Sequence, residues 1–198
     1  CINQASKRIY LASYIFDNNS SGIAIAEALS AAVKRGVEVK VIVDGLSEFM
    51  TRPRIGFRLL ELGVPFQRFN PVSLWPPALN INMRNHRKLL LVDGEWAFTG
   101  GQNIGDRHLA DKLDNPHRVY DIHFQLRGTI VDDMELAFLQ DWHYCADSEE
   151  SLSYTGGNMP DPDANIWARL VLHGPTRDIE KLTHLIVGAI SAAKQEVL

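Results

Sequence analysis

The stretch HRKLLLVDGEWAFTGGQN, residues 86–103, says most about the fold of this chain. It contains two apolar runs, residues 88–93 and 96–99, separated by a glycine, which is a pattern typical of a β-hairpin. His86 and Lys88 lie two positions apart at its start, so in an extended strand both side chains would lie on one face. The stretch therefore predicts a hairpin that presents an imidazole and an ammonium group together.

The residue types at this hairpin suit a reaction at a phosphodiester. Such an anion repels hydroxide, so a neutral nitrogen nucleophile such as His86, which bonds to phosphorus and later leaves, is an effective catalyst. Lys88 would offset the charge on the nonbridging oxygens. Gly101 and the glycine before it allow close approach of the backbone, and Asn103 can donate its side-chain amide to the same oxygens. We expect a phosphate site that uses no metal ion and no other cofactor.

The residues around the hairpin alternate between strand and helix patterns, which favours an α/β sandwich. The predicted strands outside the hairpin are residues 9–16, 37–43, 64–69, 120–126 and 166–172. The predicted helices are residues 23–34, 54–62, 129–143 and 178–194. The first strands and helices follow one another as parallel βαβ units do.

Composition divides the chain into three parts. Residues 1–145 form the first predicted domain, and residues 146–165 are acidic, rich in glycine and proline and without periodicity, as in a linker or lid. Residues 166–198 are predicted to begin a second, truncated copy of the domain, because residues 193–198 can be laid on residues 5–10. We therefore expect the chain to be part of something longer.

The quoted stretch resembles the signature of the phospholipase D superfamily, H-x-K-x4-D followed after six residues by G-[GS]-x-N, with every fixed position filled. The resemblance implies the HKD-type αβα sandwich, a mixed sheet flanked by helices, as the first half of a duplicated pair. It also implies catalytic roles for His86, Lys88 and Asp93. At a strand end beside Gly94, however, Asp93 suits a structural brace of the hairpin better than a reacting group.

A nucleophilic histidine needs an acceptor that fixes its tautomer. Asp121, in the segment YDIH, resembles the carboxylate that orients the histidine in this superfamily. The alternative for Asp121 is a charge at a strand end, paired with Arg118 or Arg127. His123, two residues further on, is expected to be packed or exposed on the strand.

Further segments resemble the N-terminal half of bacterial cardiolipin synthases and span nearly the whole chain. They are YIFD (14–17), RGV (35–37), VDG (43–45), FNP (69–71), RNHRK (84–88), FTGGQNIGD (98–106) and QDW (140–142). Thr129 departs from the family, which usually has proline there, at a position that looks structural.

The resemblance implies transfer of a phosphatidyl group from one phosphatidylglycerol to the hydroxyl of another. In the family, the histidine at the position of His86 is usually assigned as the one that takes the phosphatidyl group. The sequence alone does not say whether His86 or a histidine of the second half attacks first. A histidine of a second half, in the same chain or in a dimer mate, would act as acid and base. The resemblance also implies a protein at the bacterial inner membrane, bound peripherally or anchored by segments outside this chain. We expect the isolated chain to be inactive.

The 198 residues are 45% hydrophobic and 22% charged, with a net charge of −4. Residues 51–88 carry seven basic residues and one acid, which indicates either an anion site or a solvated helix face. Cys1 and Cys145 lie too far apart to suggest a disulfide framework or a zinc site. No apolar run approaches the roughly 20 residues that span a bilayer.

The loop at residues 70–85 carries proline and large apolar side chains, which suit acyl chains or a membrane surface; burial under the second half is the alternative. The apolar residues are Val72, Leu74, Trp75, Leu79, Ile81 and Met83.

Two other functions remain open. One is a phospholipase D or nuclease-like phosphodiesterase of the same superfamily, although the acidic total charge speaks against a nucleic-acid partner. The other is a half without catalytic activity that serves as a structural or binding module. The remaining histidines have no partner at ligand spacing and are predicted to be structural. They are His108, His117, His143, His173 and His184.

Overall fold

The computed structural model describes residues 1–72, 83–112, 114–146, 166–172 and 180–197. The chain divides into two compact units, residues 1–165 and residues 166–198. The first unit contains the predicted hairpin and every predicted site residue. In the second unit, one helix is described.

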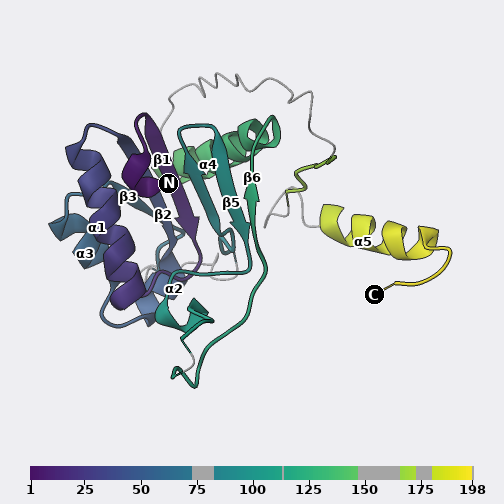
Figure 1. Ribbon diagram of the computed structural model, residues 1–198, viewed down its shortest axis with the longest axis horizontal. Coiled ribbons are helices and arrows are strands. Elements are labelled where there is room, and N and C mark those ends of the chain that lie inside the picture. The colour runs from purple at the N-terminus through teal and green to yellow at the C-terminus, as the bar shows by residue number, and fades with distance from the viewer. Residues whose placement is uncertain (73–82, 113, 147–165, 173–179, 198) are drawn as a thin grey trace. The chain divides into compact units, whose positions relative to one another are not determined.

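A six-stranded mixed sheet forms the centre of the first unit, with the order β3-β2-β1-β4-β5-β6 (Figure 1). The strands are β1 (Arg8–Ser13), β2 (Glu38–Asp44), β3 (Phe66–Phe69), β4 (Leu89–Val92), β5 (Trp96–Gly100) and β6 (His123–Leu126). β1, β2 and β3 run parallel, whereas β4, β5 and β6 each run antiparallel to the preceding neighbour. The predicted hairpin is therefore the β4–β5 pair in the middle of the sheet.

Helices cover both faces of this sheet. They are α1 (Ser20–Lys34), α2 (Gly45–Met50), α3 (Ile55–Glu61) and α4 (Ile130–Ala146), together with the short 3-10 helices η1 (Ile2–Gln4) and η2 (Asp106–His108). α1 and α3 share one hydrophobic core with β1 and β2, and α4 packs on the opposite face (Figure 1). The predicted αβα sandwich is confirmed.

The two faces follow from the alternation of side chains along β1. Ile9 and Leu11 belong to the core beneath α1, where each buried side chain contributes about 1.5–3 kcal/mol. Tyr10 points the other way and stacks on Phe138 of α4, with ring centroids 5.0 Å apart. The hydrophobic pattern of one strand thus holds helices on both sides.

Three details differ from the sequence-based expectations. Strand β4 begins at Leu89, so His86 and Lys88 precede it instead of lying within it. Helix α2 was not predicted; it begins because the side chain of Asp44 accepts hydrogen bonds from two backbone N–H groups of its first turn. The prediction of a strand at residues 166–172 is wrong, because these residues form no regular structure and pair with none of the described strands.

The second unit contributes α5 (Lys181–Ala192), which matches the helix predicted for residues 178–194. Across the described ranges of both units, no helix combines the length and the apolar character needed to span a membrane.

Candidate active site

His86 is exposed, while the residues on either side of it are anchored. The backbone N–H of Asn85 donates to Asp44 (3.1 Å), and the Asn85 side chain donates to Asp141 (2.8 Å). The Arg87 guanidinium also binds Asp141. Burial raises the pKa of Asp141, and Arg87 and Asn85 oppose that shift. Two largely buried carboxylates therefore fix the backbone around His86 and leave its ring accessible.

Four of the seven basic residues in 51–88 are paired with acids of the first unit. The pairs are Arg58 with Glu27 and Glu61, Arg68 with Glu48, Arg84 with Asp44, and Arg87 with Asp141. Among the described residues, no carboxylate lies within ion-pair distance of Lys88. Four of the seven positive charges seen in the sequence are thus neutralised. Within the described ranges no ion pair is seen for Arg52, Arg54 or Lys88, and of these three only Lys88 lines the pocket.

The ring of Tyr14, just beyond β1, contacts both His86 and Lys88. It stacks on the imidazole of His86, with centroids 4.0 Å apart and planes 20° apart. The Lys88 ammonium lies 5.2 Å from the Tyr14 ring centroid and donates to the backbone oxygen of His86 at 2.8 Å. Burial lowers the pKa of Lys88, and the negative charge of Asp121 opposes this. The imidazole and the ammonium thus both contact the Tyr14 ring, although neither residue lies in a strand, and their joint binding of one phosphate stays a prediction.

Asn103 enters the same region from the loop after β5. Its side-chain oxygen accepts a hydrogen bond from the backbone N–H of Ile15 at 3.1 Å, which leaves the amide nitrogen to donate to a ligand. Gly101 lies directly against Asp121, because a Cβ atom there would lie 2.3 Å from Oδ1 of Asp121 and the Asp121 side chain would have to move. The glycine and the carboxylate therefore meet directly.

Asp121 lies beside His108. Its Oδ2 is 3.0 Å from Nδ1 of His108. In the described part of the chain, no hydrogen bond joins Asp121 to His86, so the predicted orienting role of Asp121 stays a prediction.

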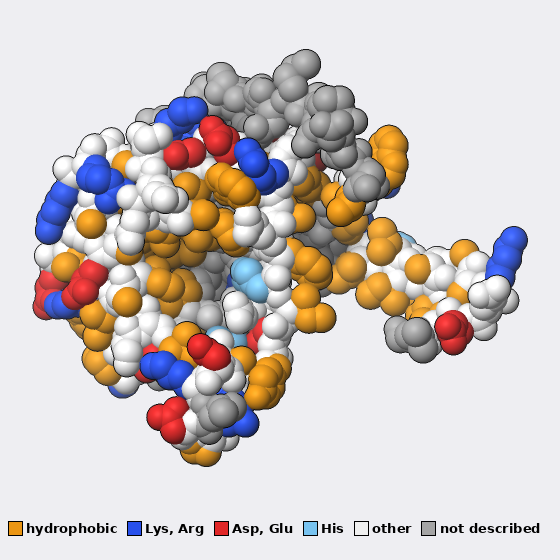
Figure 2. Space-filling model, viewed as in Figure 1, with side chains coloured by type: hydrophobic (Ala, Val, Ile, Leu, Met, Phe, Trp, Pro, Cys, Tyr) orange, Lys and Arg blue, Asp and Glu red, His pale blue; other side chains and the backbone are white. Residues whose placement is uncertain are grey.

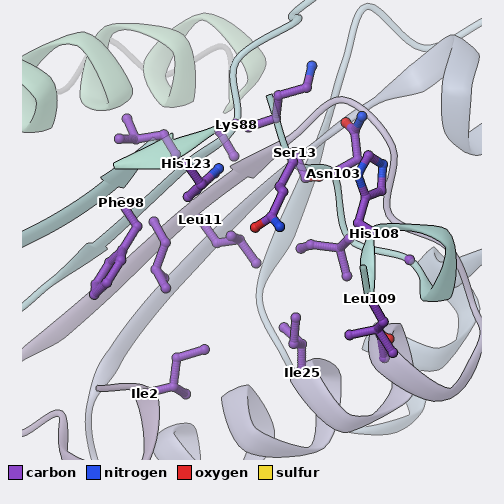
Figure 3. A pocket seen from close by; sticks show the side chains of 17 residues that line it. Ile2, Leu11, Ser13, Ile25, Lys88, Phe98, Asn103, His108, Leu109 and His123 are labelled. Atoms are coloured by element: carbon purple, nitrogen blue, oxygen red, sulfur yellow. The ribbon is translucent and has the colours of Figure 1, made fainter. Parts of the chain in front are cut away.

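Lys88, Asn103 and His108 line a pocket of about 360 Å³ on the face of the sheet that carries α1 (Figure 3). His86, Gly101 and Asp121 are not among its lining residues and lie next to residues that are. Lys88, Asn103, His108 and His123 contribute polar groups, whereas the rest of the lining is mainly apolar. The apolar residues include Ile2, Leu11, Ile25, Leu90, Phe98, Ile104 and Leu109. Figure 2 shows histidine side chains beside apolar ones where this face is hollowed. The pocket is amphipathic, with its cationic group at Lys88.

Three of the nearby residues were not predicted as part of the site. In the sequence, Tyr14 stands in a segment that resembles the family, and the pattern predicts a packed or exposed His123 and a structural His108. Burial lowers the pKa of His123, and Asp121 opposes that shift. Nothing in the local sequence of His108 indicates its position, because the contact with Asp121 joins two ends of a long loop.

Asp93, the third residue of the signature, lies at the other end of β4 from Lys88. Its carboxylate accepts hydrogen bonds from the backbone N–H groups of Ser6, Lys7 and Arg8 at 2.8–3.2 Å. Burial alone would raise the pKa of Asp93, but these bonds outweigh it and hold the pKa below its usual value. Asp93 joins the hairpin turn to the start of β1, away from the pocket.

Some predicted features lie outside the described residues. They are the apolar loop residues Leu74, Trp75, Leu79 and Ile81, together with His173 and most of the predicted linker at 146–165.

Comparison with known proteins agrees with this geometry. Residues 1–142 match the model of the family described as "Cardiolipin synthase, PLD-like domain". The chain is 34% identical over 201 residues to the major cardiolipin synthase ClsA of Bacillus subtilis and equally so to a cardiolipin synthase of Clostridium perfringens. It covers 41% and 42% of these two proteins, which in turn match 100% and 99% of the chain. The chain thus spans about two fifths of their length.

The fold is shared with solved structures of low sequence identity. NucT from Helicobacter pylori matches with a TM-score of 0.54 at 18% identity, covering 73% of this chain and 84% of that one. The phosphatidylserine synthase of Haemophilus influenzae matches with a TM-score of 0.53 at 16% identity, covering 68% of this chain and 31% of that one. With the family match over residues 1–142, these findings show that the chain belongs to the phospholipase D-like family of the cardiolipin synthases.

Proposed function

We propose that this chain supplies one half of the active site of an enzyme that transfers phosphatidyl groups between phospholipid head groups and makes cardiolipin from phosphatidylglycerol. The observation that carries the proposal is the contact of the exposed His86 with Lys88 through Tyr14, beside the pocket that Asn103 borders. The curated relatives named above are cardiolipin synthases, which favours this substrate class.

The reaction would proceed in two displacements at phosphorus. A ring nitrogen of His86 attacks the phosphorus of the first phosphatidylglycerol, and the bond from phosphorus to the glycerol oxygen breaks. Lys88 and the amide of Asn103 offset the charge on the nonbridging oxygens. The hydroxyl of a second phosphatidylglycerol then attacks the phosphohistidine, the P–N bond breaks and cardiolipin leaves. Asp93 serves the fold and takes no part in these steps.

The proton transfers require a partner for His86. The leaving glycerol must gain a proton and the acceptor hydroxyl must lose one, which a histidine of a second half would mediate. That half would lie in the same chain or in a dimer mate. The relatives are more than twice as long as this chain, and the apolar side chains of Tyr120, Ile122 and Phe124 next to Asp121 are 57–72% exposed.

The substrate places the enzyme at a membrane surface. We propose the bacterial inner membrane, with peripheral attachment or an anchor in other segments, because the named relatives are bacterial cardiolipin synthases. Replacing Leu74 and Trp75 with serine is expected to weaken binding to vesicles of phosphatidylglycerol. Unchanged binding would favour burial of this loop against another part of the protein.

A nuclease-like phosphodiesterase is the weaker alternative. Backbone contacts to nucleic acid need free cations along a track. Here the arginines at 58, 68, 84 and 87 are engaged with acids of the same fold.

The deciding experiment uses the protein in which this chain is joined to its second half. It is incubated with phosphatidylglycerol vesicles, and cardiolipin and glycerol are measured for the unchanged protein and for His86→Ala. The matched control is His117→Ala, an exposed histidine outside the pocket. We expect the first variant to lose cardiolipin formation by a factor of at least about 10³ and the control to keep it. Equal activity of His86→Ala, or hydrolysis of single-stranded DNA in place of lipid transfer, would refute the proposal.

A further inference from the structure

A buried histidine that the proposed reaction does not use lies in the wall of the same pocket. The side chain of His108 is 7% exposed, and its Nδ1 lies 3.0 Å from Oδ2 of Asp121. Among the described residues, neither ring nitrogen makes a well-directed hydrogen bond. Leaving a buried polar group without a partner costs about 1–3 kcal/mol. A small rotation of either side chain would therefore form a hydrogen bond between His108 and the carboxylate of Asp121.

The short helix η2, which carries this histidine, is held from two sides. The carboxylate of Asp106 accepts hydrogen bonds from the backbone N–H and the hydroxyl of Ser21, at 2.8 and 2.6 Å, at the start of α1. The backbone N–H of Val119 donates to the oxygen of Arg107 at 2.7 Å. This second bond joins η2 to the segment that leads to Asp121. These hydrogen bonds therefore hold the imidazole of His108 and the carboxylate of Asp121 close together.

Asp121 in turn acts on the polar groups of the pocket. Burial lowers the pKa of Lys88 and of His123, and the negative charge of Asp121 opposes both shifts. Asp121 is therefore close enough to interact electrostatically with both groups. The Asp121 side chain is 26% exposed and could turn toward water. Its Oδ1 lies over Gly101, the position where a Cβ would be only 2.3 Å away.

We propose that His108 is a positioning residue, which holds Oδ2 of Asp121 so that Oδ1 stays above Gly101 at the reaction centre. The inference rests on the proposed phosphatidyl transfer and adds a residue to it. Among the described residues, no hydrogen bond or ion pair joins His108 to His86 or Lys88, so its effect would pass through the carboxylate. Residues that hydrogen-bond to the ligands of metal sites orient those ligands in a similar way, and their loss costs about 10- to 100-fold in affinity or activity. We expect an effect of the same size here.

The test is a double-mutant cycle in the protein that contains both halves, with transfer from phosphatidylglycerol as the assay. The four proteins are the unchanged enzyme, His108→Phe, Asp121→Asn and the double variant. We expect His108→Phe to lower kcat about 10- to 100-fold with little change in KM, but to cost less than about twofold when Asp121 is already asparagine. His108→Gln, which keeps a donor, should recover part of kcat. His117→Phe in the exposed part of the same loop is the matched control and should keep full activity.

Other outcomes separate the possible failures. Equal losses from His108→Phe in both backgrounds, or activity equal to that of His117→Phe, would overturn the positioning role. If the unchanged enzyme makes no cardiolipin, or His86→Ala has no effect, the proposed function itself has failed. Thermal melting of each variant identifies a folding defect; if the phenylalanine variant does not fold, the same cycle with His108→Asn decides.

Discussion

Asp93 illustrates how a residue of a catalytic signature can serve the fold. At φ +57° it occupies the left-handed region in the hairpin turn, and its carboxylate receives the backbone N–H groups of Ser6, Lys7 and Arg8. These bonds attach the turn between β4 and β5 to the start of β1. Through them, Asp93 fixes the register of the strand that leads back to Lys88.

We predict that Asp93→Asn lowers the free energy of unfolding by about 1–3 kcal/mol at pH 7, because three N–H groups lose an ionised acceptor. The folded pKa of Asp93 lies below its usual value of 3.8. Its stabilising contribution is therefore present above pH ~3.8 and is lost as the pH falls through the folded pKa. Urea unfolding of both proteins at pH 7, 5 and 3.5 measures this. Asp111→Asn, at an exposed site, is the control. A difference that grows toward low pH would contradict the assignment.

At the scale of elements, the ends of β5 and β6 determine where the carboxylate of the site lies. Gly100 pairs with His123, and the N–H of Gly101 donates to the oxygen of Ile122 at 2.9 Å. The two strands leave room for Asp121 only because no Cβ stands at Gly101.

We predict that Gly101→Ala reduces phosphatidyl transfer at least about tenfold while changing the melting temperature little. The added methyl group would displace the end of a flexible side chain, Oδ1 of Asp121, and would leave the backbone in place. Transfer assays and thermal melting of the two-half protein measure the two effects. Gly188→Ala, where a Cβ meets no atom within 4 Å, is the matched control. Full activity of Gly101→Ala would show that Asp121 has no role in the reaction.

The same elements show what the sequence could reveal. The hairpin and β1, β2 and α1 were predictable because their apolar residues repeat with the period of the element. Helix α2 depends on the cap that Asp44 provides, and residues 166–172 form no regular structure although their apolar pattern predicts a strand. His86, Lys88 and Asn103 were found through a signature with fixed spacing. His108 was not, since its contact with Asp121 is visible only after the loop has folded.

On the scale of the whole molecule, an apolar stripe borders the candidate site. Tyr120, Ile122 and Phe124 are 68%, 72% and 57% exposed, and Phe124 lies on β6, one of the two edge strands of the sheet. Exposed apolar side chains at a sheet edge favour association. Because Asp121 lies between Tyr120 and Ile122, a partner that covers this stripe would also lie close to the candidate site.

We therefore predict that Ile122→Ser with Phe124→Ser weakens the packing of the second half. In the two-half protein, the double variant should lose cardiolipin synthesis at least about tenfold and unfold at a lower temperature, because about 1.5–3 kcal/mol per covered side chain would be lost. In this chain alone, where both side chains are exposed, melting should change little. Phe57→Ser, an equally exposed apolar residue on α3, is the matched control. If both variants behave alike in the two-half protein, the stripe is not the surface that the second half covers.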